Sequence, residues 1–157
     1  MVIVPLPKPP ELEKLLGALL MRPVKATRLE EGAPTGPLVT ALFASEEPVL
    51  QVLVRTELKL AASLAAALSV VPLTAVKEAI KAGQMDESLQ DNCSEVMNVL
   101  SRFISGGGRP FRLGAITFPP AALDAGLTAA VDGSDEKREL RIEVPGYDAG
   151  LLEFVTL

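Results

Sequence analysis

Residues 89–104 read LQDNCSEVMNVLSRFI, and their pattern predicts a long amphipathic helix. Apolar side chains recur at the i, i+3, i+4, i+7 spacing of a helix that packs one face on a core. They are Leu89, Cys93, Val96, Leu100, Phe103 and Ile104. On a helical wheel the opposite side carries Asp91, Glu95, Asn98 and Arg102, with Ser94 and Ser101 at its edge. Asp86 suits the N-cap, and Gly106-Gly107-Gly108 ends the helix after about Ser105.

The segments on either side predict a sheet, with helices grouped in the middle of the chain. We expect helices over 11–20, 57–69 and 72–81, a short helical stretch over 119–125, and strands over 24–29, 38–44, 49–55, 111–118, 127–131, 139–144 and 151–157. Short turns between neighbouring strands favour antiparallel pairing. The order predicts an α+β fold, with an antiparallel β-sheet of about six strands covered on one face by two or three long helices.

The length of 157 residues is that of one domain. Residues 1–10 contain four prolines, and we expect them to form an extended proline-rich lead-in to a single domain over 11–157. Hydrophobic residues make up 48% of the chain but aromatic residues only 4%, so the predicted core is mostly aliphatic.

Composition also disfavours several classes of function. With no His and one Cys, the chain lacks the usual ligands of zinc and the base of a Ser-His or Cys-His nucleophile. A net charge of −5 without a basic run argues against binding to nucleic acid. The most apolar helix candidate, over 58–71, contains Lys59 and is shorter than the roughly 20 residues that span a bilayer. We therefore expect a cytoplasmic protein that binds neither nucleic acid nor membrane and holds no cofactor or metal of its own.

Glu95 and Asn98 are the candidate site residues. Three residues turn a helix by about 300°, so the two side chains lie on neighbouring rows of one face. The carboxylate of Glu95 can anchor a cation, and the amide of Asn98 can hold a water by donating and accepting at once. The pattern Glu-x-x-Asn is also common on faces that are merely solvated, so the residues alone leave a site and a solvated surface as alternatives.

The stretch from Asp91 to Asn98 resembles the signature of the CheC/CheX/FliY group of chemotaxis phosphatases. In that group an Asp or Ser stands four residues before a Glu, an Asn three after it, and a Pro some twenty residues further on. Asp91, Glu95, Asn98 and Pro119 or Pro120 fill those places. The order of elements from about residue 24 to 157 is similar as well, and the turn Pro145-Gly146-Tyr147 before the last strand resembles CheX-like members.

The resemblance implies a phosphatase that acts on the aspartyl phosphate of a CheY-like receiver domain. The receiver supplies the phosphoaspartate and the Mg²⁺. By this resemblance Glu95 forms an ion pair with the receiver's active-site lysine, and Asn98 orients the attacking water. Phosphoryl transfer needs mainly positioning and charge stabilisation, which such a pair can provide.

Some expectations stay open at the level of sequence. CheC-type members carry two such motifs, but the block over 57–81 has no Glu-x-x-Asn, so one site is expected, as in CheX-like members. CheX-like proteins can form a homodimer through their sheet edges, which this sequence neither shows nor excludes. The alternative function is a non-catalytic binding module that docks a receiver domain or a flagellar-switch component. A metabolic enzyme is disfavoured, since the chain has no His and no cofactor motif.

Overall fold

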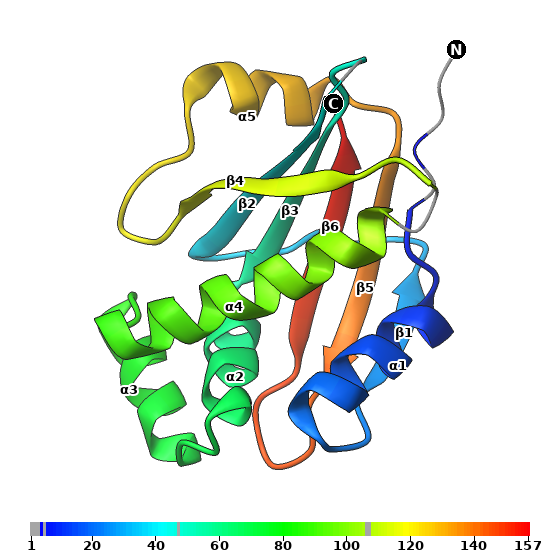
Figure 1. Cartoon of the computed structure of the whole chain (residues 1–157). Coiled ribbons are helices and arrows are strands. Elements are labelled where there is room, and N and C mark those ends of the chain that lie inside the picture. The colour runs from blue at the N-terminus through cyan, green and yellow to red at the C-terminus, as the bar shows by residue number, and fades with distance from the viewer. Residues whose placement is uncertain (1–3, 5, 47, 106–107) are drawn as a thin grey trace.

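The computed structural model describes residues 4, 6–46, 48–105 and 108–157. They form one six-stranded antiparallel sheet with the strand order β1-β5-β6-β3-β2-β4. The strands are β1 (Lys25–Leu29), β2 (Leu38–Ser45), β3 (Gln51–Glu57), β4 (Phe111–Thr117), β5 (Lys137–Glu143) and β6 (Gly150–Thr156). The described helices are α1 (Pro9–Leu20), α2 (Leu58–Leu68), α3 (Leu73–Ala82), α4 (Glu87–Ile104) and α5 (Ala125–Asp132). Helices α1, α2 and α4 lie over one face of the sheet (Figure 1), so the expected α+β fold is confirmed.

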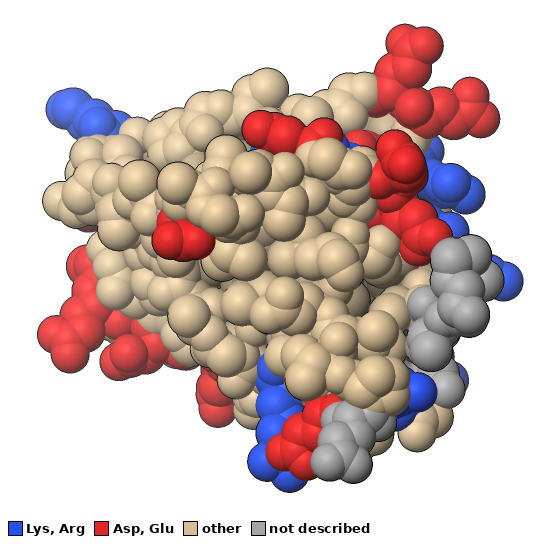
Figure 2. Space-filling view, turned by 90° about the horizontal axis from the view of Figure 1, so that it is seen from above, with Lys and Arg blue, Asp and Glu red and all other residues tan. Residues whose placement is uncertain are grey.

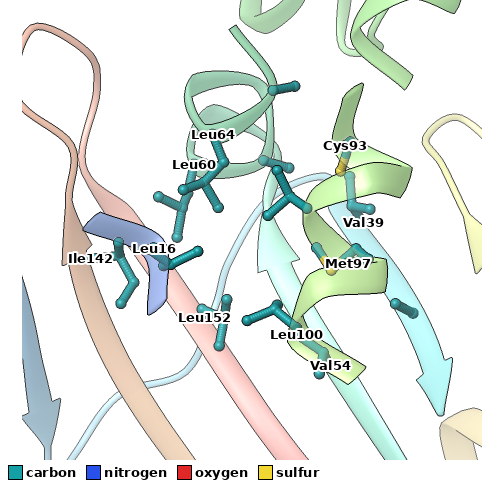
Figure 3. Close-up of a cluster of buried hydrophobic side chains, with 14 of the residues drawn as sticks. Leu16, Val39, Val54, Leu60, Leu64, Cys93, Met97, Leu100, Ile142 and Leu152 are labelled. Carbon is teal, nitrogen blue, oxygen red and sulfur yellow. The ribbon is translucent and has the colours of Figure 1, made fainter. Parts of the chain in front are cut away.

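Helix α2 lies at the centre of the helical layer. It contacts β2, β3 and β6 as well as α1, α3 and α4. Its sequence LKLAASLAAAL is rich in alanine, and nine of its eleven residues are buried. Small alanine side chains let the neighbouring helices and the sheet approach on all sides, which is typical of a helix buried all round. Figure 3 shows Leu60 and Leu64 of α2 among the side chains of α1, α4 and the sheet.

Helix α4 packs its apolar stripe on this core, as its sequence predicts. Its buried residues are Leu89, Cys93, Val96, Met97, Leu100, Ser101 and Ile104. Met97 and Ser101 extend the buried stripe beyond the predicted one, because the side of the helix that faces β4 is covered as well. The carboxylate of Asp86 accepts a hydrogen bond from the Leu89 amide at 2.8 Å, which confirms the predicted N-cap. Gly106 and Gly107 of the predicted stop lie outside the described residues.

The segment after β4 differs from the prediction. Residues 119–124 form turns and irregular structure rather than a helical stretch, and residues 127–131 form part of helix α5 rather than a strand. The carboxylate of Asp124 explains the difference, because it accepts hydrogen bonds from the amides of Gly126 and Leu127 and so starts the helix there. Val131 of α5 packs with Leu53 and Val155 on the face of the sheet opposite α2 and α4.

The beginning of the chain is also joined to the domain. Helix α1 starts at Pro9, two residues earlier than expected, because proline is well tolerated in the first turn of a helix. Val4 and Pro7 are buried, and the guanidinium of Arg138 donates hydrogen bonds to the carbonyls of Leu6 and Pro7. Residues 1–3 and 5 of the expected lead-in lie outside the described residues. No helix in the described part of the chain is long and apolar enough to cross a membrane.

Candidate functional site

The outward face of α4 carries six exposed residues, and the four that follow its first turn, Asp91, Glu95, Asn98 and Arg102, are called the polar row here. From Glu95 to Asn98 the helix rises by about 4.5 Å, and from Asn98 to Arg102 by about 6 Å. All four residues lie within about 60° of one another around the helix axis. Asn98 therefore lies between a carboxylate and a guanidinium along one open surface. The structure places both predicted site residues together and facing solvent.

Helix α4, which carries the polar row, is held in place by core packing and by hydrogen bonds from its N-terminal half to the end of α2. The side-chain amide of Asn92 donates to the Ala65 carbonyl at 3.1 Å and to Ser69 Oγ at 2.9 Å, which ties α4 to the end of α2. Cys93 is fully inside the core, as predicted. Burial raises the pKa of its thiol to about 12, so the group stays neutral and structural. The site residues thus project from a part of the helix whose position is set by packing.

Within the part of the chain that the structure describes, no hydrogen bond or ion pair engages the side chains of the polar row. Other charged groups are tied internally: Lys77 binds Asp148 at 2.9 Å, and Arg55 binds Glu153. Free carboxylate, amide and guanidinium groups side by side can bind a partner's charges and orient a water. The arrangement can perform chemistry only on a group that is brought from outside.

Pro119 and Pro120, the two candidates for the proline of the motif, lie near the same helix. Both line a shallow groove of about 680 Å³ that also includes Gln90 of α4 and Gln84 before it. Pro119 is buried and Pro120 is exposed. The groove adjoins the N-terminal half of α4 on its β4 side, so the structure brings the proline pair to one flank of the polar row.

Other surfaces offer less chemistry. Figure 2 looks onto the end of the molecule where α5 lies, and that face is mostly uncharged, with acidic and basic side chains around its margins. The exposed residues within α5 include Ala125, Ala129 and Ala130, which have no functional group. Among the described residues, no group of three or more His, Cys, Asp or Glu could hold a metal ion. The polar row of α4 is the best candidate site.

Two groups that are prominent in the structure, Arg102 and Glu57, have no functional role predicted from the sequence. Arg102 was placed on the polar side of the helix, and the structure shows its side chain exposed without a partner in the described chain. Glu57 is the first residue of the helix predicted over 57–69, but it is only 5% exposed and accepts hydrogen bonds from the amides of Thr35 and Leu151. Its burial depends on contacts distant in sequence, which a single sequence does not reveal.

Comparison with models of known protein families finds no match, and comparison with curated protein sequences finds none either. Comparison with solved structures does find similar folds. FliM of H. pylori, in a complex with SpeE, matches with a TM-score of 0.70 at 7% identity, over 94% of this chain and 80% of that one. FliY of Thermotoga maritima matches with a TM-score of 0.58 at 13% identity, over 92% and 81% of the two chains. CheX of Vibrio vulnificus matches with a TM-score of 0.53 at 12% identity, over 94% and 95%.

These likenesses confirm the fold that the motif implied. The chain has the fold shared by CheX, CheC-like proteins, FliY and the middle domain of FliM. At such low identity the likeness establishes the fold alone, and function has to be argued from the residues of the site.

Proposed function

We propose that this protein is a phosphatase that removes the phosphoryl group from the aspartyl phosphate of a CheY-like receiver domain. One observation carries the proposal: Glu95 and Asn98 project together from the exposed face of α4, with no side-chain partner inside the described chain. Solvation of a helix face does not require a glutamate at position 95 or an asparagine at position 98. Asparagine also forms helices weakly, at a cost of about 0.5 kcal/mol relative to alanine, so helix stability does not explain Asn98. The proposal includes a cytoplasmic location, where receiver domains act.

In this mechanism Glu95 docks the receiver through an ion pair with its active-site lysine. The amide of Asn98 then enters the receiver's site and accepts a hydrogen bond from a water while its N–H donates another. The water is held in line with the phosphorus and the leaving aspartyl oxygen. Water attack breaks the phosphorus–oxygen bond, releasing inorganic phosphate and restoring the aspartate. The Mg²⁺ bound by the receiver would supply charge stabilisation at the phosphoryl group, and this chain would contribute docking through Glu95 and the position of the water through Asn98.

The test is the decay of phosphorylated receiver domains from the same organism, with Mg²⁺, in the presence of this protein. Wild-type protein should accelerate the decay of at least one receiver. Asn98→Ala should lower kcat by about 100-fold, because the attacking water loses its orientation. Glu95→Ala should raise KM by at least about tenfold with a smaller effect on kcat, because a docking ion pair is lost.

A control variant tests whether the loss of any exposed glutamate changes kcat or KM. Glu31 is an exposed glutamate just after β1, at the opposite edge of the sheet from β4, on which α4 packs, so Glu31→Ala should leave both constants unchanged. If wild-type protein accelerates the decay of no receiver, the phosphatase proposal is wrong.

The second candidate function is a non-catalytic module that docks a receiver domain or a flagellar-switch component. It is favoured by the likeness to FliM, whose TM-score of 0.70 is above those to FliY and CheX, and which is seen in a complex with a protein partner. On this alternative the polar row binds a partner without hydrolysis. Binding that is lost in Glu95→Ala but unaffected in Asn98→Ala, without any acceleration of phosphate loss, would support it.

A further inference from the structure

Arg102 occupies a distinctive position beside the proposed site. It follows Asn98 by four residues, which places it about 6 Å further along α4 and about 40° around the axis. Glu95 lies on the other side of Asn98, so the order along the exposed face is carboxylate, amide, guanidinium. Side chains of a helix point back toward its N-terminus, over the preceding turn, so the long side chain of Arg102 extends toward Asn98 and its guanidinium can reach the group that the Asn98 amide faces.

The fold itself does not use this guanidinium. Arg102 is exposed, and in the described part of the chain its side chain has no hydrogen bond or ion pair. Arg55 and Arg138, by contrast, are held by Glu153 and by the carbonyls of Leu6 and Pro7. The helix dipole favours a base in the last turn of α4, but it does so for any face of that turn. Dipole stabilisation therefore does not account for a base in line with Glu95 and Asn98.

We propose that Arg102 binds an oxyanion of the docked partner, either a phosphoryl oxygen or a carboxylate beside the phosphoryl group. The inference rests on the proposed function, because it takes the group in front of Asn98 to be an aspartyl phosphate. A water that Asn98 holds for in-line attack lies within a few ångströms of the phosphoryl oxygens. The planar guanidinium is the side chain best suited to bind phosphate or carboxylate with two parallel hydrogen bonds.

The charge order of the polar row also fixes the direction of docking. Asp91 and Glu95 are like charges at i, i+4, an arrangement that disfavours the helix and so is not explained by helix stability. Together they attract a basic group towards the N-terminal half of α4. Arg102 attracts an anionic group towards the C-terminal end. A partner with a lysine beside its phosphoryl group is therefore aligned along α4 in one direction, with the phosphoryl group over Asn98 and Arg102.

The test compares two variants of Arg102. Arg102→Gln removes the charge but keeps a polar side chain, whereas Arg102→Lys keeps the charge but cannot form two parallel hydrogen bonds with an oxyanion. Arg141→Gln is the matched control, since Arg141 is exposed on β5 between the core-facing Leu140 and Ile142 and so lies on the opposite face of the sheet. Binding is measured to the receiver loaded with Mg²⁺ and beryllium trifluoride, a phosphoryl mimic, and to the receiver with Mg²⁺ alone. The rate of phosphate loss is measured in parallel.

We expect Arg102→Gln to weaken binding or lower kcat/KM by about tenfold or more, as for a lost hydrogen bond between charged groups. Arg102→Lys should recover part of the loss, and Arg141→Gln should match wild type. A loss confined to the loaded receiver identifies a phosphoryl oxygen, whereas an equal loss for both forms identifies a carboxylate. Unchanged or tighter binding and unchanged or faster turnover in Arg102→Gln would overturn the inference. The binding measurements decide this even if no hydrolysis occurs, so failure of the phosphatase proposal is seen separately.

Discussion

Replacing Glu57 with glutamine should destabilise the fold by about 2–4 kcal/mol. The carboxylate of Glu57 is nearly inaccessible, and its two oxygens accept from different segments. Oε1 accepts from the Leu151 amide at 2.7 Å, and Oε2 accepts from the Thr35 amide at 3.0 Å and from the Thr35 hydroxyl at 3.3 Å. A glutamine offers one oxygen and one NH₂ group, so the NH₂ faces a backbone N–H in one of these places.

The size of the effect follows from that mismatch. One hydrogen bond to a charged group, worth about 1.5–3 kcal/mol, is lost, and a buried N–H is left without an acceptor at a cost of about 1–3 kcal/mol. The two terms overlap, and relief from burying a charge, reduced by loss of the ion pair of 3.8 Å between Oε1 and the half-exposed Lys59 Nζ, offsets part of them, which gives the range of about 2–4 kcal/mol. Loss of this hydrogen bond is expected to weaken the packing between three segments that meet at Glu57: the segment before β2, the start of α2 and the start of β6.

Urea unfolding followed by circular dichroism measures the change in the free energy of unfolding. The dependence of the free energy of unfolding on urea concentration should keep the same slope, because unfolding of the variant exposes the same surface. Glu78→Gln, on the exposed side of α3, is the matched control and should stay within about 0.5 kcal/mol of wild type. A Glu57→Gln variant as stable as this control would refute a stabilising role for the hydrogen bonds that the carboxylate accepts from Thr35 and Leu151.

Three further changes test other parts of the fold. A Cβ at Gly150 would lie 2.8 Å from Leu60 Cβ, so Gly150→Ala should lower stability to urea by about 1–3 kcal/mol, and an unchanged midpoint would contradict this close packing. Asp86→Ala removes the N-cap of α4 and should cost about 1 kcal/mol in the same assay, whereas full stability would show that the cap is dispensable. Burial, together with the hydrogen bond and charge of Glu153, raises the pKa of Glu139 above its ordinary value of 4.5. The folded state therefore binds the Glu139 proton more tightly than the unfolded state. Glu139 stabilises the fold fully below its ordinary pKa, and this contribution is lost as the pH rises from the ordinary pKa through the raised pKa of the folded state. Glu139→Gln removes this fall, so the stability of the variant relative to wild type should increase from about pH 4 upward; a difference independent of pH would count against the assigned cause.

The polar row could be predicted from sequence because the periodicity of one helix determines it. The stripe from Leu89 to Ile104 defines the buried side of α4, and the exposed positions of Glu95 and Asn98 follow from the helix geometry without knowledge of the rest of the fold. Helix α2 was predictable for a similar reason, since an alanine- and leucine-rich run of this length suits a buried helix.

The segment after β4 was mispredicted because local signals conflict there. Residues 127–131, Leu-Thr-Ala-Ala-Val, suit a strand or a helix by composition, and the N-cap at Asp124 decides for the helix. Its packing partners, Leu53 and Val155, lie on strands distant in sequence. The role of Glu57 could not be predicted for the same reason, because Thr35 and Leu151 meet it only after the sheet has formed.

In the proposed mechanism Asn98 orients the water that hydrolyses a partner's aspartyl phosphate. The most direct test is the rate constant of phosphate loss from a phosphorylated receiver with Mg²⁺ and saturating protein, compared between wild type and Asn98→Ala. We predict acceleration by wild type and an about 100-fold smaller rate constant with Asn98→Ala, at unchanged affinity for the receiver. Equal acceleration by the two proteins would show that Asn98 does not place the water, and the account would be wrong.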